Sequence, residues 1–225
     1  PETGGPVPGL AERWEMSADG KTWTFHLRHG VEFAGGYGEM TAADVKYSIE
    51  RLIGEDSRAG PASTMRRTID NVEIVDDYTV VVNLKLPDYA LAAGYFGSAQ
   101  QLGIVSMAYV ESLGEGAATA APIGTGAYVL ESQEAGSEIV MSLRDDLGDH
   151  WRVDPDFETV TFKLAPEEST RVAMLQTGEA DIAPVSFDSI PSLRDAGIDI
   201  VSAQETWSPV VRLGGLVMND PNRYN

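Results

Sequence analysis

The chain has 225 residues, 43% of them hydrophobic and 23% charged, so it is long enough to bury a core as one large domain or two small ones. Its 35 acidic and 16 basic residues give a net charge of -19, which argues against a nucleic-acid partner and against adsorption to anionic membranes. There is no cysteine, which excludes disulfides, thiolate chemistry and cysteine-bound zinc.

The composition also bears on where the chain works. Its acidic surface indicates solubility, with adaptation to a salt-rich habitat as the alternative. No apolar run reaches the ~18 residues needed to span a bilayer, so we expect no direct membrane insertion. Because residues 1–5 carry no Met or basic-then-apolar leader and residues 220–225 end abruptly, we expect the chain to be a piece of a longer protein.

The first predicted element is a β-hairpin. Residues 14–16 and 23–28 flank Asp19-Gly20, a dipeptide typical of tight hairpin turns. Apolar residues alternate in the second strand, which places three side chains on one buried face: Trp23, Phe25 and Leu27.

A helix follows the hairpin. Thr41 is placed to cap its first turn, Asp44 resembles the second half of a capping box, and Gly54 ends it. The other elements expected up to residue 121 are a polar loop at 58–68, a hairpin of 72–75 with 78–84, short helices at 88–96 and 107–113, and a flexible stretch at 114–121 that marks a subdomain boundary.

The pattern changes after Pro122. The expected elements are a hairpin of 127–132 with 139–143, a strand at 160–164, a helix at 167–177, a strand at 181–183, a helix at 186–196, and strands at 198–201 and 210–218. This alternation predicts an α/β lobe with helices packed on a mixed sheet.

Motifs for chemistry are weak. His26 and His29 point to opposite faces of a strand, so they do not form a metal site, and His150 stands alone. Residues 145–149 are acidic but lack calcium-loop spacing, and Gly124-Thr125-Gly126 lacks the lysine and following helix of a phosphate loop. We therefore predict no catalytic residues, no metal and no cofactor.

Three stretches together resemble a known family. They are residues 9–33 continuing into 40–51, residues 122–128 (PIGTGAY), and residues 169–182 (STRVAMLQTGEADI). In order and spacing they are similar to the bacterial extracellular solute-binding proteins of family 5, the dipeptide-, oligopeptide- and nickel-binding components of ABC importers. Residues 35–39 depart from the short Asp-Gly turn that is usual in that family.

The resemblance implies a periplasmic-binding-protein-like fold of type II, a mixed α+β architecture in which two lobes close on a ligand. The chain would supply lobe I only, as a peripheral subdomain (residues 1–121) and an α/β core subdomain (residues 122–225). A solvent-exposed face is expected where the absent lobe II would pack.

The implied function is capture of a dipeptide or oligopeptide for import, without chemistry. The implied partners are the solute and the permease subunits of an ABC importer. We expect a monomer that is periplasmic or extracellular, with a lipid anchor on the full-length protein. The alternatives are an oligosaccharide, nickel chelate or opine-like solute in the same fold and, outside the family, a sensor module or an enzyme.

The resemblance and the position of the segments suggest two groups of ligand contacts. The first follows the helix begun at Thr41, where the family has a cleft-lining loop; its candidates are Gly60, Pro61, Met65 and Arg66. The second approaches the hinge; its candidates are Trp207, Ser208, Arg212 and Gly214. Trp207 is either a stacking platform or a core residue, and Arg212 either a partnered charge or a clamp for a carboxylate.

Overall fold

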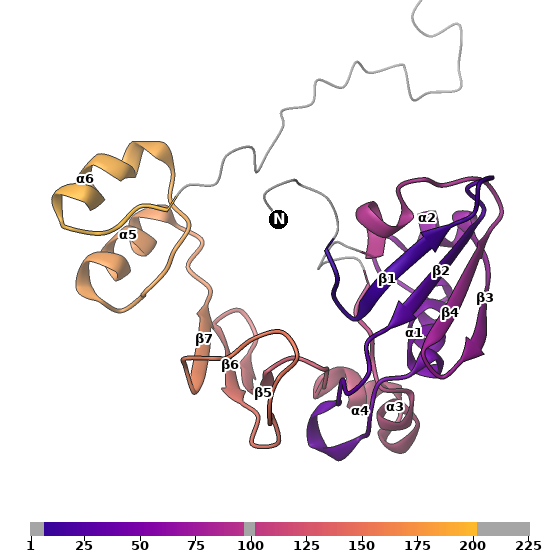
Figure 1. The fold of residues 1–225 in the computed structure, drawn as a ribbon. Helices are drawn as coiled ribbons and strands as arrows, with labels where there is room; N and C mark the ends of the chain where they lie inside the picture. The colour runs from indigo at the N-terminus through magenta and orange to yellow at the C-terminus, as the bar shows by residue number, and fades with distance from the viewer. Residues whose placement is uncertain (1–6, 97–101, 202–225) are drawn as a thin grey trace, which may run out of the picture. The chain divides into compact units, whose positions relative to one another are not determined.

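A computed structural model describes residues 7–96 and 102–201 of the chain (Figure 1). The chain divides into two compact units, Pro1–Lys163 and Leu164–Asn225. The boundary expected between residues 121 and 122 lies inside the first unit and stays a prediction. The strand expected at 210–218 lies outside the described residues.

The first unit begins with a four-stranded antiparallel sheet of order β1-β2-β4-β3. The strands are β1 (Ala11–Met16), β2 (Thr22–Leu27), β3 (Ile69–Asp76) and β4 (Thr79–Leu84). In β2 and β4 apolar residues alternate with polar or half-buried ones, so each strand buries one face. Both predicted hairpins are confirmed.

The Asp19-Gly20 turn forms as predicted. The Oδ1 atom of Asp19 accepts hydrogen bonds from the Ser17 hydroxyl at 2.6 Å and from the Lys21 amide at 3.1 Å. Gly20 has a φ of 69°, in the left-handed region that glycine adopts without strain. The ring of Tyr89 lies directly over this glycine.

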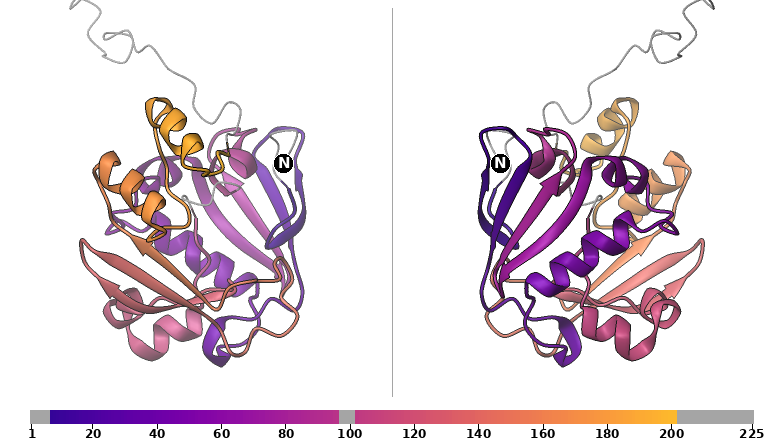
Figure 2. Two further views of the ribbon diagram at one scale, coloured as in Figure 1. Left: turned by 90° about the vertical axis from the view of Figure 1, so that its left-hand side faces the viewer. Right: turned by 90° about the vertical axis from the view of Figure 1, so that its right-hand side faces the viewer.

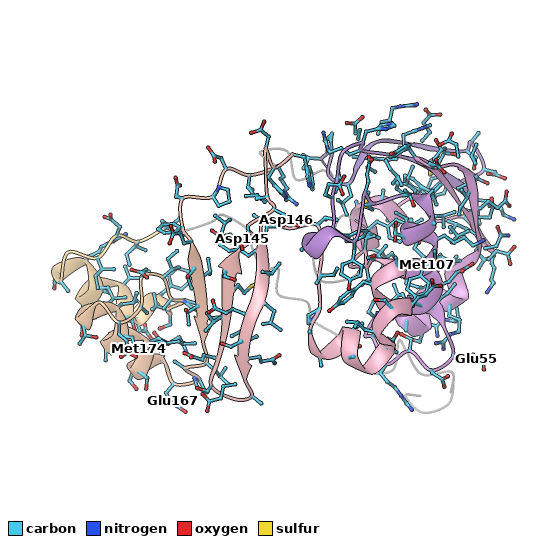
Figure 3. All side chains as sticks on the ribbon, turned by 90° about the horizontal axis from the view of Figure 1, so that it is seen from below. Glu55, Met107, Asp145, Asp146, Glu167 and Met174 are labelled. Atoms are coloured by element: carbon cyan, nitrogen blue, oxygen red, sulfur yellow. The ribbon has the colours of Figure 1, made fainter. Side chains whose placement is uncertain are left out.

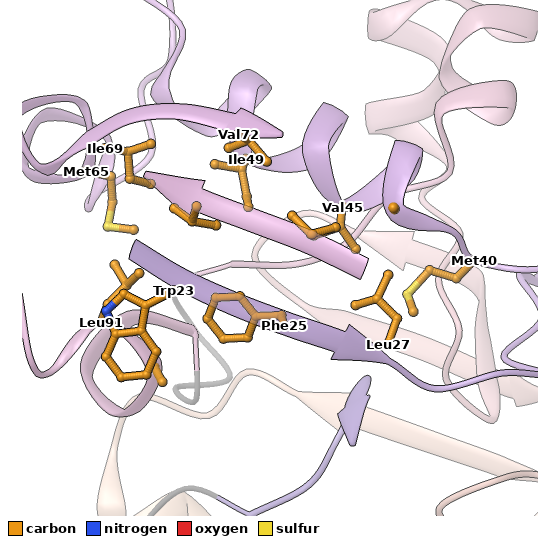
Figure 4. Packing of buried hydrophobic residues seen from close by; sticks show 14 of the residues in the cluster. Trp23, Phe25, Leu27, Met40, Val45, Ile49, Met65, Ile69, Val72 and Leu91 are labelled. Atoms are coloured by element: carbon orange, nitrogen blue, oxygen red, sulfur yellow. The ribbon is translucent and has the colours of Figure 1, made fainter. Parts of the chain in front are cut away.

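The helix α1 (Ala42–Ile53) covers the inner face of the sheet (Figure 2). Asp44 completes the predicted capping box, and its Oδ2 accepts from the Thr41 amide at 2.9 Å. Val45 and Ile49 pack into the main hydrophobic cluster (Figure 4). The buried side chains of this cluster include Trp23, Phe25, Leu27, Met40, Met65, Ile69, Val72, Val80, Val82, Leu84 and Leu91.

Two segments differ from the prediction. The polar loop expected at 58–68 contains the helix α2 (Ala62–Thr68). Pro61 directly precedes its first turn, where a proline costs no hydrogen bond and is therefore compatible with a helix. The flexible stretch expected at 114–121 contains α4 (Glu115–Ala120), where Ala118 packs against Tyr109 and Val110 of α3 (Met107–Leu113). The short helix expected at 88–96 is narrower, a π-helical turn at Ala92–Phe96.

The first unit ends with a second antiparallel sheet of order β5-β6-β7. Its strands are β5 (Tyr128–Glu134), β6 (Glu138–Leu143) and β7 (Thr159–Lys163), close to the predicted positions. Ile139 lies opposite Phe162, and Met141 opposite Val160, so one face is apolar. No side chain of these three strands is fully buried.

The second unit contains α5 (Glu168–Thr177), a 3-10 turn (Phe187–Ser189) and α6 (Ile190–Asp195). The end of α5 at Gly178 is as predicted. The strands expected at 181–183 and 198–201 are not formed. A strand needs a neighbour for its backbone hydrogen bonds, and no described segment pairs with these residues. Ile182 and Val201 are accordingly 92% and 96% exposed, and Leu193 alone is buried among this unit's described residues.

Candidate functional site

The loop predicted to line a ligand cleft leads into α2. Gly60 is exposed and Pro61 half-buried at the start of this helix. Met65 is fully buried in the main cluster, and the Nε of Arg66 donates to the Ile53 carbonyl at 2.8 Å. Arg66 also contacts the Gly54 carbonyl, so it caps the C-terminus of α1.

The four predicted residues of this loop therefore divide by accessibility. Gly60 is exposed, and the Pro61 carbonyl accepts from the amides of Thr64 and Met65 at 3.0 and 2.9 Å. The side chains of Met65 and Arg66 hold α2 against α1 and the sheet. The second predicted group, comprising Trp207, Ser208, Arg212 and Gly214, lies outside the described residues. Both groups remain predicted contacts.

A polar junction connects the two sheets of the first unit. Its centre is Arg144, which follows β6 and has a side chain only 4% exposed. Its Nη1 and Nη2 atoms donate to the carbonyls of Glu32 and Phe33 at 3.0 and 3.1 Å. Its Nε donates to Asp146 at 2.6 Å, so all three kinds of guanidinium nitrogen have acceptors.

Asp146 completes the junction from the loop that follows β6 (Figure 3). Its second carboxylate oxygen accepts from the Gly35 amide at 3.1 Å. Hydrogen bonding to the Arg144 guanidinium holds the pKa of Asp146 below its ordinary value of 3.8. Within the acidic segment 145–149, which lacks calcium-loop spacing, Asp146 is thus a hydrogen-bond acceptor for Arg144.

The Gly124-Thr125-Gly126 turn is part of the same junction. The Ala34 amide donates to the Gly124 carbonyl at 3.0 Å, and His150 Nε2 lies 3.0 Å from the Thr125 carbonyl. Neither glycine has a positive φ, and a Cβ at either position would have no neighbour closer than 4.0 Å. Backbone groups therefore make the contact, and it does not require glycine at either position.

Sequence reasoning missed the junction: it considered His150, residues 145–149 and the Gly124–Gly126 turn only as sites for metal or phosphate, and it did not single out Arg144. Arg144 closes an apolar strand and precedes two aspartates, which is a weak signal for a buried charge. Two of its acceptors are main-chain carbonyls more than one hundred positions away, and side-chain identity does not mark these.

Histidines and carboxylates do not form a metal site in the described parts of the chain, where no group of three or more potential ligands converges. His26 lies 3.2 Å from Arg13, and His29 stacks on Tyr78 with 3.6 Å between ring centroids. None of the helices described is long and apolar enough to cross a membrane.

Comparison with known proteins decides the family. The family description "Bacterial extracellular solute-binding proteins, family 5 Middle" matches residues 5–222. The chain belongs to the family 5 solute-binding proteins. The fold class predicted from the three sequence stretches is therefore confirmed.

The proteins to which the chain is similar include some whose ligands are named. The dipeptide-binding protein of Escherichia coli K12 is 30% identical over 197 residues, which cover 79% of this chain and 36% of that protein. A structure of AgaA from A. tumefaciens R10 with agropinic acid is 30% identical with a TM-score of 0.72, covering 84% of this chain and 37% of AgaA. DppA from Helicobacter pylori, in complex with the peptide STSA, is 27% identical with a TM-score of 0.70.

The alignments also show how much of a family 5 protein is present. The chain spans little more than a third of the length of these relatives, which fits one lobe of the two-lobed fold. The match to DppA covers 84% of this chain and 40% of that protein.

Proposed function

We propose that this chain is the first lobe of a solute-binding protein that captures dipeptides or oligopeptides for an ABC importer. The 30% identity to a dipeptide-binding protein across most of the chain carries this proposal. The full-length protein would work outside the cytoplasmic membrane as a lipid-anchored monomer and deliver its solute to permease subunits.

Binding without chemistry is the second part of the proposal. The family consists of binding proteins. The junction residues all serve in hydrogen bonds that hold the scaffold. We therefore propose that the protein is not an enzyme.

For the contacts themselves, we propose a division of labour in the loop before α2. The exposed backbone at Gly60 would offer main-chain groups to an extended peptide, as peptide-binding surfaces commonly do, and Pro61 would contact it through its ring, because its carbonyl is engaged in α2. Met65 and Arg66 support the proposal indirectly, because they fix the position of that backbone. From the second predicted group, Trp207 would stack on a side chain, Ser208 and Gly214 would line the cleft, and Arg212 would hold the peptide carboxylate.

An opine-like solute is the alternative, favoured by the likeness to the AgaA complex with agropinic acid. Native mass spectrometry of the purified full-length protein separates the two. We expect masses of short peptides released on denaturation. Recovery of a sugar-amino acid conjugate, or of a metal chelate, without peptide would overturn the peptide assignment.

Calorimetry with a matched ligand pair tests the role of Arg212. The full-length protein should bind a dipeptide more tightly than the same dipeptide with an amidated C-terminus. The loss should be about ten- to hundredfold, because a charge-assisted hydrogen bond contributes about 1.5–3 kcal/mol. Arg212→Gln should abolish that discrimination, and Arg194→Gln, at an exposed position of α6, should preserve it. Equal discrimination in both variants would show that another group holds the carboxylate.

A further inference from the structure

One buried carboxylate serves the starts of two helices. The Oδ2 atom of Asp44 accepts from the amide and the hydroxyl of Thr41, at 2.9 and 3.2 Å, at the start of α1. Its Oδ1 accepts at 2.9 Å from the amide of Met107, the first residue of α3. Backbone amides at a helix start have no partner within the helix, so an acceptor from outside stabilises them. Asp44 supplies such an acceptor to α1 and α3 at the same time.

Two more side chains of α1 bind the α3–α4 hairpin or the residues just before it. The Ser48 hydroxyl accepts from the Val105 amide at 2.9 Å. Arg51, in the last turn of α1, donates from Nε to the Glu115 carboxylate of α4 at 2.8 Å. Residues 44, 48 and 51 are four and three positions apart, so they lie on one face of α1. This face is a polar stripe that holds the hairpin.

The hairpin has little apolar packing of its own. Among the described residues its buried cluster consists of Tyr109, Val110 and Ala118, whereas α1 buries Val45 and Ile49 in the much larger main cluster. The two helices of the hairpin have only 7 and 6 residues. Helices shorter than about 12–15 residues are marginal in water without tertiary contacts. The hairpin therefore depends on its hydrogen bonds to α1 more than the four-stranded sheet does.

The hairpin also lies on the path of the chain between the two sheets, after β4 and before β5. The Tyr109 hydroxyl contacts the carbonyl of Ala121, which ties α3 to the residue that ends α4. Gly124 follows closely and belongs to the polar junction, where its carbonyl accepts from the Ala34 amide at 3.0 Å. The hairpin and the junction thus hold the two ends of one short segment, residues 121–124.

We propose that Asp44 is a latch, and that the α3–α4 hairpin opens from α1 as one unit when the bond from Met107 to Asp44 breaks. The four-stranded sheet stays folded during this opening, because no described residue of α3 or α4 belongs to the main apolar cluster. Water can replace each partner on the polar stripe, so the opening costs less free energy than unfolding the sheet. The device does not depend on which solute the protein binds.

Native-state hydrogen exchange of the full-length protein tests the unit without a variant. The Gly114 amide is bonded to the carbonyl of Val110 in α3, and the Ala118 amide to the carbonyl of Gly114 at the start of α4. In a series of low denaturant concentrations these two amides should share one free energy of opening. After correction for intrinsic rates they should exchange at least about tenfold faster than the amides of β4. Equal protection in the hairpin and in β4 would refute the proposal.

Met107→Pro tests the latch itself. Proline has no amide hydrogen to donate to Asp44, yet it is favourable at the first position of a helix. Ser106 before it has a φ of -70° and a ψ of 119°, a conformation that a following proline permits. Exchange of the Gly114 and Ala118 amides should become about ten- to hundredfold faster, the effect of losing one hydrogen bond to a charged group. The amides of β4 should keep their wild-type rates.

Met107→Ala is the matched control, because it removes the same side chain and keeps the amide. The hairpin amides should exchange at least about tenfold more slowly in Met107→Ala than in Met107→Pro. Equal exchange in the two variants would overturn the latch, because the bond to Asp44 would then contribute nothing. If Met107→Pro alone accelerates the β4 amides as much as those of the hairpin, or alone fails to fold, the hairpin does not open independently and the proposal is wrong.

Discussion

Arg144 donates from Nε to the carboxylate of Asp146 across 2.6 Å, and this pair connects two sheets whose strands are far apart in the sequence. Each partner also reaches the turn after β2: Arg144 through the carbonyls of Glu32 and Phe33, and Asp146 through the amide of Gly35. The guanidinium is almost wholly buried, whereas the carboxylate side chain is 45% exposed. This charged pair fixes the position of the 31–36 turn, because its side chains form hydrogen bonds with the backbone carbonyls and amide of that turn.

Removing the guanidinium should loosen this turn. Arg144→Met keeps much of the apolar stem but leaves two main-chain carbonyls without their donors. Each acceptor left unpaired costs about 1–3 kcal/mol, so for the two together we expect a local loss of about 2–6 kcal/mol. The readout is amide exchange of Ala34 and Gly35 in the full-length protein, which should become at least thirtyfold faster, on the order of 2 kcal/mol.

Two further variants show whether the effect comes from the buried network. Arg144→Lys keeps the charge but not the planar fork, so it should recover only part of the protection. Arg13→Met removes another arginine that pairs with an acid, but this pair is on the surface with both side chains more than 60% exposed. It should change stability by less than about 0.5 kcal/mol. Similar effects of Arg144→Met and Arg13→Met would contradict the role given to burial.

Much of the peripheral fold was predictable because its signals are local. The Asp19-Gly20 turn, the alternation in β2 and the capping box of Thr41 with Asp44 each depend on residues within a few positions of one another. The same logic failed at α2, where Gly60 and Pro61 suggested a loop although proline is favourable at a helix start.

The junction, the pairing of two expected strands and the orientation of Met65 were not predictable, for a different reason. Arg144 and His150 bind main-chain carbonyls, and every residue type has one of these, so only the tertiary fold selects the partner. Residues 181–183 and 198–201 have the sequence of strands, but pairing depends on segments that the described chain does not provide. Met65 was chosen for its place after a helix, and that place says nothing of whether the side chain points outward.

The turn at Gly20 gives a second prediction, on steric grounds. A Cβ at this position would lie 2.8 Å from the Tyr89 ring and would also force a side chain into the left-handed region. Gly20→Ala should therefore destabilise the β1–β2 hairpin by about 2 kcal/mol or more, of which about 1–2 kcal/mol is the backbone cost. Amide exchange of Ser17 and Thr22, which pair across this turn, measures the change.

Gly30 is a matched control for that substitution. It has a φ of 70°, almost identical to that of Gly20, but nothing lies within 4 Å of a Cβ placed there. Gly30→Ala should show the backbone cost alone, measured at the Phe33 amide that pairs with Gly38 nearby. Adding Tyr89→Ala to Gly20→Ala should remove the excess over Gly30→Ala. If the excess persists in the double variant, the clash with the ring is not its cause.

The last prediction concerns Glu168, which ties the start of α5 to the segment before α6. One oxygen of its carboxylate accepts from the Ser189 hydroxyl at 2.5 Å and from the Ser186 amide and hydroxyl at 2.9 and 2.8 Å. These donors stabilise the charged form, led by Ser189, and lower the pKa of Glu168 from 4.5 to about 2. A lowered pKa means that the folded arrangement is favoured by ionisation. Its contribution is complete above pH 4.5, and it declines as the pH falls towards 2.

An NMR titration of the Ser186 amide follows this carboxylate directly, because the amide is one of its donors. We expect the shift to change with a midpoint near pH 2 in the full-length protein, and Glu168→Gln to abolish the transition and weaken the tie at neutral pH. Glu167→Gln alters the neighbouring carboxylate, which takes no part in the serine cluster, and should leave the midpoint unchanged. A midpoint near 4.5 in the wild type would mean that the serines do not hold the charged form. In that case acid would have no selective effect on the packing of α5 with α6, since the carboxylate would titrate alike in the folded and unfolded chain.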